Sequence, residues 1–385
     1  MTVRVNKPAI NVREELADLR KPTGIAGEAM LRAETPQEQF NLIGAGRRNL
    51  IINGDMRIAQ RGTSQTVTTT GQFYVIDRFA GIMGSSYAPN VTVSQETDAP
   101  SGFANSLKVR CDAVTTPTSN QNFLMRQSLE GQDLQCLGYG TSEAKYLSIS
   151  FYVKASQTGT RGLWVMGSPA KREWMATYTI DQANTWEYKT IVIPPNTLES
   201  LENDNAAGIL FCFPLSTGSS DKRDASTSWE NETGYRGLSG EPDFCDTVGN
   251  TWQITGFQVE LGKVATPFEH RSYGEELALC QRYFERKHYE YGAMLNTTNW
   301  TSTDAYGGLE YTTKRATPAA TVSSISDFSH YGGGTARTLT GLVVQSEGVQ
   351  AGTIRVITGG TLTLYQSSWI EATTGGGYFD IDAEL

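Results

Sequence analysis

Aromatic side chains mixed with polar ones are the groups in this sequence that could do binding chemistry. Sugar rings expose apolar C–H faces that stack on Trp and Tyr, while neighbouring Asp, Asn and Arg side chains bond the hydroxyl groups. The candidate glycan-binding residues of this kind are Trp229, Tyr235, Trp300, Tyr306 and Tyr311. A place in the core is the competing interpretation for each of them. Trp164, Trp186 and Trp252 lie within strand patterns, which favours the core.

Carboxylates gather in a long polar stretch between Ser216 and Thr251. They are Asp221, Asp224, Glu230, Glu232, Glu241, Asp243 and Asp246. Two carboxylates held a few ångströms apart can hydrolyse a glycosidic bond, and several can bind calcium, although the D-x-[DN]-x-[DN]-G loop is absent. We favour a solvated acidic loop without chemistry, and keep ion binding and glycan hydrolysis as alternatives.

Other catalytic signatures are missing from the sequence. Its three histidines form no HExxH pair, and His270 beside Glu269 is most simply structural. There is no GxSxG elbow, no GxxxxGK[ST] phosphate loop and no GxGxxG after a strand. We therefore predict no catalytic residue, no cofactor and no metal site, and a protein that is not an enzyme.

Composition and charge narrow the class of protein. The 385 residues carry 41 acidic and 32 basic side chains, a formal net charge of -9, which predicts no general affinity for nucleic acid or anionic membranes. No segment approaches the length of a membrane span, and the first residues show no signal-peptide core. We expect a soluble protein made in the cytoplasm, without membrane insertion.

The five cysteines show no CxxC spacing. An odd number cannot all pair within one chain, so we predict free thiols packed in cores, as in a reducing cytoplasm. A disulfide between Cys212 and Cys245 is the alternative.

Period-two alternation and high glycine content predict a mainly β chain. Residues 147–153 alternate apolar and polar side chains, Trp186–Ile193 reads as another strand, and the apolar run Ala207–Phe213 predicts an interior strand. Short strands at this spacing predict a jelly-roll-like β-sandwich over residues 46–270. A barrel or an irregular β-domain is the alternative.

The end of the predicted sandwich leads into a helix. The apolar phase slips at Gly256, which indicates a β-bulge, and Ser272 with Glu275 matches a capping box. Leu277, Cys280 and Phe284 follow at helical spacing, so we predict a helix over 273–287 within a linking segment, residues 271–289. A second β-domain, residues 290–385, ends in a half-buried strand from Phe379 to Leu385.

Residues 1–45 differ from the rest, being charged and poor in aromatics. Asn11 and Thr35 are placed to cap two short helices, each too small to bury a core alone. We predict a short helical N-terminal segment that docks on symmetry mates or on another protein; a partly ordered leader is the alternative.

Several long segments resemble tail-fibre and related receptor-binding structural proteins of tailed bacteriophages, notably those of marine and cyanobacterial phages. They are NLIINGDMRIAQRG (Asn49–Gly62), FYVIDRF (Phe73–Phe79), WQITGFQVELGKVATPFEHRSYGEELALCQRYF (Trp252–Phe284), FDIDAEL (Phe379–Leu385) and the leader EAMLRAETPQEQFNLIGAG (Glu28–Gly46). This chain lacks the extended glycine-repeat, collagen-like or heptad shaft of long fibres.

The resemblance implies a virion structural protein, a short tail fibre or related appendage. It implies a carbohydrate-binding-like jelly roll, a homotrimer, attachment of residues 1–45 to another phage tail or adaptor protein, and contact with host surface polysaccharide through the distal part, here the C-terminal β-domain. No active-site residue is carried over. The alternatives are a glycan depolymerase and a purely structural tail or capsid decoration.

Overall fold

The computed structural model describes Arg32 and residues 48–84, 86–168, 172–231, 234–346 and 348–385. Asn49–Leu385 forms one compact unit, which contains all the elements named below. The predicted docking segment, residues 1–45, lies outside the described residues except for Arg32, so its docking role stays a prediction.

The first sheet of the sandwich has six antiparallel strands within the described part of the chain. In spatial order they are β1 (Ser64–Val67), β4 (Val91–Glu96), β5 (Ser106–Cys111), β15 (Thr251–Leu261), β7 (Leu147–Ala155) and β10 (Glu187–Ile193). The alternation that predicted a strand at 147–153 places Leu147, Ile149 and Phe151 in the core.

The second sheet has seven antiparallel strands among the described residues. In spatial order they are β13 (Glu230–Asn231), β9 (Arg172–Ile180), β8 (Gly159–Gly167), β11 (Ala207–Thr217), β6 (Asn122–Glu130), β3 (Ala80–Gly84) and β2 (Gly71–Tyr74). Strand β11 pairs with β8 on one side and β6 on the other, so the run from Ala207 to Phe213 is an interior strand, as predicted.

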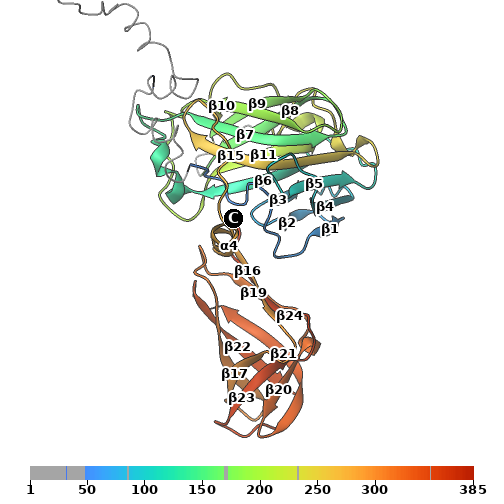
Figure 1. Cartoon of the computed structure of the whole chain (residues 1–385), viewed down its shortest axis with the longest axis vertical. Coiled ribbons are helices and arrows are strands. Elements are labelled where there is room, and N and C mark those ends of the chain that lie inside the picture. Colours follow the sequence, from blue (N-terminus) through green and yellow to red (C-terminus); the bar gives the residue numbers. More distant parts are fainter. Residues whose placement is uncertain (1–31, 33–47, 85, 169–171, 232–233, 347) are drawn as a thin grey trace, which may run out of the picture. The chain divides into compact units, whose positions relative to one another are not determined.

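The two sheets pack around one core (Figure 1). The ring of Phe151 in the first sheet lies edge-on to Phe213 in the second, with 5.3 Å between the ring centroids, and Trp252 lies 5.4 Å from Phe213. Such aromatic pairs add about 0.5–1.5 kcal/mol each beyond the burial of apolar area. Trp164 and Trp252 are buried, as predicted, whereas Trp186 is half-buried.

The polar stretch between Ser216 and Thr251 is built of very short elements. Strands β12 (Lys222–Arg223) and β14 (Gly237–Leu238) form a parallel pair, and the 3-10 helices are η2 (Ser219–Asp221) and η3 (Phe244–Asp246). Another 3-10 helix, η1 (Gly131–Leu137), follows β6. Side chains from η3 reach the core, since Phe244 and Cys245 are buried.

The predicted bulge and capping box are both confirmed. Gly256 has a φ of 63°, and the register of β15 against β7 shifts between Thr255 and Gln258. Ser272 caps helix α4 (Tyr273–Gln281), and Glu275 completes the capping box. Among the described residues, no helix combines the length and apolarity that crossing a membrane requires.

The prediction that this helix runs to Lys287 is wrong. Helix α4 ends at Gln281, and the chain continues as strand β16 (Phe284–Tyr289), which pairs along its whole length with β24 (Gly377–Asp382). Helical spacing of Leu277, Cys280 and Phe284 is a local signal, and pairing with a strand from the far end of the chain overrides it. The final strand predicted from Phe379 to Leu385 is confirmed as β24, although it begins at Gly377 and ends at Asp382.

The C-terminal part holds a small sheet and a closed barrel. Strand β24 lies between β16 and β19 (Ala319–Val322). The barrel strands, in order, are β17 (Met294–Asn299), β18 (Asp304–Glu310), β22 (Ala351–Thr358), β21 (Thr335–Ser346), β20 (Phe328–Gly332) and β23 (Ser367–Ala372), with η4 (Ile325–Asp327) before β20. The predicted fold class, a mainly β chain with a jelly-roll-like sandwich, a helix after it and a second β-domain, is confirmed for the described residues.

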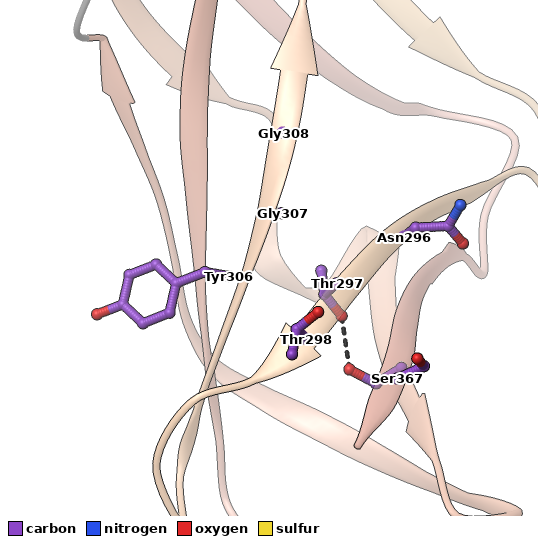
Figure 2. Close-up of a pocket in the computed structure, with 8 residues that line it drawn as sticks. Asn296, Thr297, Thr298, Tyr306, Gly307, Gly308 and Ser367 are labelled. Atoms are coloured by element: carbon purple, nitrogen blue, oxygen red, sulfur yellow. Dashed lines mark hydrogen bonds between the residues drawn. The ribbon is translucent and has the colours of Figure 1, made fainter. Parts of the chain in front are cut away.

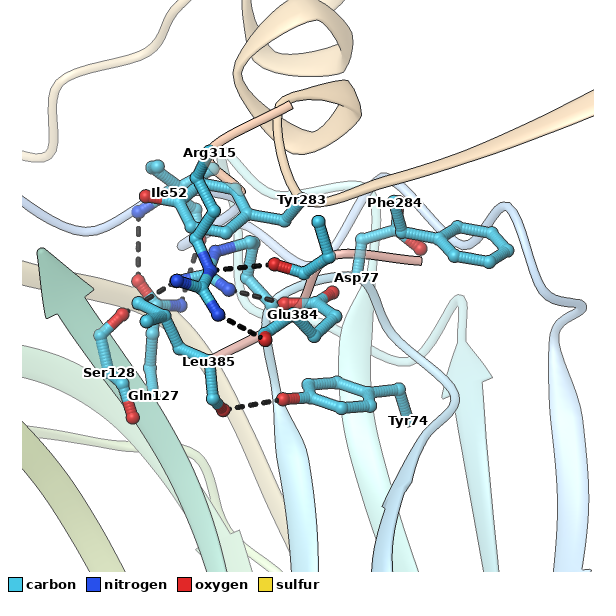
Figure 3. Close-up of polar contacts among 12 residues, drawn as sticks. Ile52, Tyr74, Asp77, Gln127, Ser128, Tyr283, Phe284, Arg315, Glu384 and Leu385 are labelled. Carbon is cyan, nitrogen blue, oxygen red and sulfur yellow. Dashed lines mark hydrogen bonds and ion pairs between the residues drawn. The ribbon is translucent and has the colours of Figure 1, made fainter. Parts of the chain in front are cut away.

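Four segments that carry the family resemblance meet at one place, which we call the arginine joint: Arg61, Arg78, Tyr283, Phe284 and Glu384. Figure 3 labels Tyr283, Phe284 and Glu384 of this group. The guanidinium carbon of Arg78 lies 3.4 Å from the ring centroid of Tyr283, and that of Arg61 lies 3.4 Å from the ring centroid of Phe284. Arg78 also forms an ion pair with Glu384; their side chains are 1% and 4% exposed. The charges therefore compensate one another in a largely water-free setting.

The last residues of the chain are fastened to the same region. The Ala383 amide donates to the Tyr283 carbonyl (2.7 Å), the Arg315 guanidinium donates to the Glu384 carbonyl (2.8 Å), and the Tyr74 hydroxyl donates to the Leu385 carbonyl (3.0 Å; Figure 3). Tyr74 belongs to β2 of the sandwich. These bonds and the arginine joint therefore hold the C-terminal strands against the sandwich.

Candidate functional site

Two exposed aromatic rings lie together at one end of the barrel. Trp300 follows β17 and is 61% exposed, and Tyr365 precedes β23 and is 72% exposed. Their ring centroids are 6.0 Å apart and the rings are nearly perpendicular, at 85°. We call the two loops that carry them, residues 300–303 and 359–366, the barrel tip. Large exposed aromatic surfaces of this kind mark binding sites more often than scattered single residues do.

Backbone hydrogen bonds hold the two loops of the barrel tip together. The Asn299 amide donates to the Gln366 carbonyl (3.0 Å), and the Tyr365 amide donates to the Asn299 carbonyl (2.7 Å). The Asn299 side chain adds a bond to the Thr363 carbonyl (3.0 Å). Tyr365 itself has a φ of 58°, a conformation that costs a non-glycine residue about 1 kcal/mol. The fold thus holds this ring outward at an energetic cost.

Polar groups with fixed geometry lie beside the aromatic pair. The Trp300 amide donates to the Asp304 carbonyl (2.8 Å), and the Thr301 hydroxyl donates to the Asp304 carboxylate (2.9 Å). The Arg355 guanidinium lies 3.2 Å from the same carboxylate. An ion pair next to exposed rings supplies both hydrogen-bond acceptors and donors for hydroxyl groups.

A cavity of about 640 Å³ lies along β17, β18 and β23, the strands that the barrel tip joins (Figure 2). Its lining residues are Asn296, Thr297, Thr298, Tyr306, Gly307, Gly308, Ser367 and Ser368. Thr298 and Ser367 face each other in the register of β17 and β23. Thr298 lies two residues before Trp300, and Ser367 lies two residues after Tyr365. Two residues of extended strand span about 7 Å.

Two glycines shape this cavity. A Cβ at Gly307 would lie 2.3 Å from the Asn296 carbonyl oxygen, whereas a Cβ at Gly308 would meet no atom within 4 Å. The lining contains amide, hydroxyl and phenol groups but no Asp, Glu or His. It can therefore bind neutral hydroxylated groups, and it offers no pair of carboxylates for hydrolysis.

The predicted binding residues of the C-terminal domain are only partly brought together. Trp300 is exposed at the barrel tip, and the half-buried Tyr306 lines the cavity. Tyr311 is 7% exposed, and its hydroxyl donates to the Gly348 carbonyl (2.8 Å). Its ring is thus part of the barrel wall and presents no free face to a ligand.

The two candidates in the acidic stretch lie on the sandwich, away from this cavity. Trp229 is 7% exposed, its indole N–H donates to the Pro194 carbonyl (2.9 Å), and its ring packs 5.9 Å from both Tyr139 and Trp174. Trp229 is therefore a core residue, which was the alternative to glycan binding for this side chain. Tyr235 is 40% exposed.

Sequence reasoning missed Tyr365, and it also missed the stacked pair of Tyr331 and Trp369. The planes of these two rings differ by 6°, and their centroids are 5.8 Å apart. Trp369 faces Asn296 of the cavity in the strand register. The available signal was the glycine pair Gly359 and Gly360 a few residues before Tyr365, which is typical of a loop. Tyr365 lies beside Trp300 only because the barrel closes, and the local spacing of residues does not indicate this contact.

The carboxylates of residues 221–246 occupy several separate environments. Glu230 pairs with Arg223 (2.6 Å), which also pairs with Glu173. Glu241 is buried and accepts a hydrogen bond from the Gly162 amide (3.2 Å). In the part of the chain that the structure describes, no group of three or more His, Cys, Asp or Glu side chains could hold a metal ion.

Replacing Glu241 by glutamine should stabilise the protein at pH 8 and have less effect at pH 5. Burial raises the pKa of the Glu241 carboxyl to about 7, so the fold favours the protonated form, and stability falls as pH rises from 4.5 through 7. Glutamine keeps the size and carries no charge. Guanidinium unfolding midpoints at both pH values test this, and a lower midpoint for Glu241→Gln at pH 8 would contradict it.

His330 in β20 is a buried titratable group of the barrel. It is fully buried, and neither ring nitrogen has a hydrogen-bond partner among the described residues. Burial, together with the charge of Arg337, lowers the pKa of His330. The fold thus favours the neutral ring, and its contribution to stability is present above pH 6.5 and lost as pH falls below that value.

We expect His330→Phe to reduce the loss of stability between pH 7.5 and pH 5.5. Phenylalanine has a similar shape and no group to protonate. The measurement is the shift of the unfolding midpoint between the two pH values, wild type against variant. Glu241 acts with the opposite sign, so the difference between the two proteins isolates the histidine. An equal shift in both proteins would refute the prediction.

None of the protein-family models searched matches this chain, and no curated protein matches it. Solved structures show weak similarity over about half of the chain. One is the enzymatically active domain of tailspike protein 4 of bacteriophage CBA120, at 14% identity and a TM-score of 0.30, covering 55% of this chain and 21% of that one.

Two carbohydrate-binding modules are similar at the same level. The xylan-binding domain CBM22-1 of Paenibacillus barcinonensis has 11% identity and a TM-score of 0.27, covering 57% of this chain and 100% of the module. The family 11 module of a cellulosomal cellulase of Clostridium thermocellum has 13% identity and a TM-score of 0.26, covering 54% and 98%. At these values the similarities assign no ligand or activity to this chain.

Proposed function

We propose that this protein binds glycans through the barrel tip and the adjoining cavity. The observation that carries the proposal is the exposed pair of Trp300 and Tyr365 beside a polar cavity of about 640 Å³. The rings offer apolar faces to the C–H surface of a sugar, and Asn296, Thr298 and Ser367 offer hydrogen bonds to its hydroxyls. The cavity lining holds hydroxyl and amide groups and no Asp, Glu or His, which supports a binding role, and we propose a protein that is not an enzyme.

The setting we propose is the surface of a tailed bacteriophage, where the chain acts as a short tail fibre or related appendage. The resemblance of the segments at Asn49–Gly62 and Trp252–Phe284 supports this, and those segments form the joint that holds the C-terminal domain. Residues 1–45 attach to another phage tail or adaptor protein, and the barrel tip contacts host surface polysaccharide. The chain is made in the host cytoplasm and works on the virion.

Assembly as a homotrimer completes the proposal. Three weak sites that face one cell surface gain avidity through effective concentration, so each site can be shallow. Light scattering on the purified protein at micromolar concentration should show a trimer. A stable monomer would count against this part and leave the binding site itself untouched.

Binding to purified bacterial surface polysaccharides, measured by calorimetry or on an immobilised panel, tests the glycan site. Saturable binding without the release of new reducing ends is expected. Release of reducing ends that is lost when Asp or Glu residues of 221–246 are replaced would establish the depolymerase alternative. Failure to bind any polysaccharide or host cell, with no block of phage adsorption, would favour a purely structural decoration.

A further inference from the structure

Two buried thiols lie near each other in the core of the sandwich. Cys111 is the last residue of β5, and Cys245 lies in η3. Both side chains are fully buried in the same core, and each thiol lies near enough to the other to affect its pKa. The Cys111 thiol also lies 3.3 Å from the Ala113 carbonyl.

Backbone hydrogen bonds hold the two segments in this position. The Cys111 amide donates to the Asn250 carbonyl (2.9 Å), and the Gly249 amide donates to the Cys111 carbonyl (2.8 Å). On the other side, the Thr115 amide donates to the Cys245 carbonyl (3.0 Å). The segment that contains η3 is thus fastened to the end of β5 at Cys245 and again four and five residues after it, which keeps the two cysteines in the same part of the core.

The structure separates this pair from the other cysteines. The sequence offered Cys212 as a disulfide partner for Cys245, but Cys212 packs with Trp164 and Met175 in a cluster apart from the main core, whereas Cys245 packs within that core. All five cysteines are free thiols in the structure, and Cys136 is exposed. Cys212 is therefore not the neighbour of Cys245 in the fold, and Cys111 is the cysteine that shares its core.

We propose that Cys111 and Cys245 form a disulfide when the protein meets a small-molecule disulfide such as oxidised glutathione. One protein thiolate attacks the oxidant, forms a mixed disulfide and releases one glutathione thiolate. The second protein thiolate then attacks the mixed disulfide, closes the bond between Cys111 and Cys245 and releases the second glutathione. The two protein thiols lose two electrons and two protons, and the oxidant becomes two thiols.

The burial of the pair sets the rate of this reaction. Burial raises the pKa of both thiols, so little thiolate forms while the segment of η3 is closed. Oxidation should therefore be slow in buffer and faster in guanidinium below the unfolding transition, where local opening exposes the pair. The bond would then tie two distant parts of the chain, which stabilises the sandwich mainly by restricting the unfolded state.

The test uses the full-length reduced protein, oxidised glutathione and guanidinium below the unfolding transition. After quenching and unfolding, thiol titration should show the loss of two of the five thiols. Peptide mass mapping should find a cross-linked peptide that contains Cys111 and Cys245. The unfolding midpoint should rise and return to its starting value after treatment with dithiothreitol.

Two variants and a control sharpen the result. Cys245→Ser and Cys111→Ser should each form no intramolecular cross-link and should not lose two thiols together. Cys212→Ser should still form the cross-link between Cys111 and Cys245. If a serine variant fails to fold, the peptide map of the wild type decides alone. Retention of all five thiols, or linkage only to glutathione or to the exposed Cys136, would overturn the proposal.

Discussion

Replacing Arg78 by alanine should lower the free energy of unfolding by about 3 kcal/mol, because removal of one partner leaves an uncompensated buried charge on Glu384. Arg78 is 1% exposed, donates to the Ser128 carbonyl (2.6 Å) and covers the ring of Tyr283. Arg61 lies 3.4 Å from the same carboxylate and relieves part of the penalty. Guanidinium unfolding at pH 7 measures the loss.

A matched control and a double variant separate charge from packing. Arg110 pairs with Asp112 at 2.8 Å but is 53% exposed, so Arg110→Ala should cost no more than about 1 kcal/mol. Arg78→Met together with Glu384→Gln removes both charges and keeps most of the volume. This double variant should be more stable than Arg78→Met alone. If the losses of unfolding free energy in Arg78→Met and in Glu384→Gln simply add up to the loss in the double variant, the ion pair does not stabilise the joint.

Removal of both rings of the barrel tip should abolish most glycan binding. In Trp300→Ala with Tyr365→Ala the stacking surface is lost, and aromatic anchors of this kind are worth about 2 kcal/mol or more, which is a loss of affinity of about 30-fold. The rings are 61% and 72% exposed, so their removal should leave the unfolding midpoint nearly unchanged. Titration with the polysaccharide that the wild type binds gives both affinities.

Tyr291 supplies the control for that experiment. It is 76% exposed, in the turn between β16 and β17. Tyr291→Ala removes the same exposed ring type and should keep wild-type affinity. Unchanged affinity in the double variant would place the glycan site elsewhere on the protein. An equal loss in Tyr291→Ala would show that affinity follows exposed aromatic area in general.

The arginine joint gives the resembling segments a physical role. Arg61 and Arg78 contact Phe284 and Tyr283, and both reach Glu384. The segments thus share one buried network that is closed only when both ends of Asn49–Leu385 are in place. That network gives these stretches a structural role in joining the sandwich to the C-terminal strands.

Local patterns in the sequence were sufficient for the strands and for the start of the helix. The alternation at 147–153, the bulge at Gly256 and the cap at Ser272 all depend on side chains within a few residues, and the structure has each of them. Composition, and not periodicity, named Trp300 as a candidate, because aromatic and polar side chains lie together there as they do in sugar-binding sites.

Tertiary structure alone decided what depends on distant partners. Residues 284–289 became a strand because β24 pairs with them, and Trp229 became a core residue because Tyr139 and Trp174 pack on it. Tyr365 joined Trp300 through barrel closure, and Cys245 came to share a core with Cys111. The physical reason is the same in each case: exposure and contact are set by chain segments far away in sequence, which periodicity and spacing within a short window do not register.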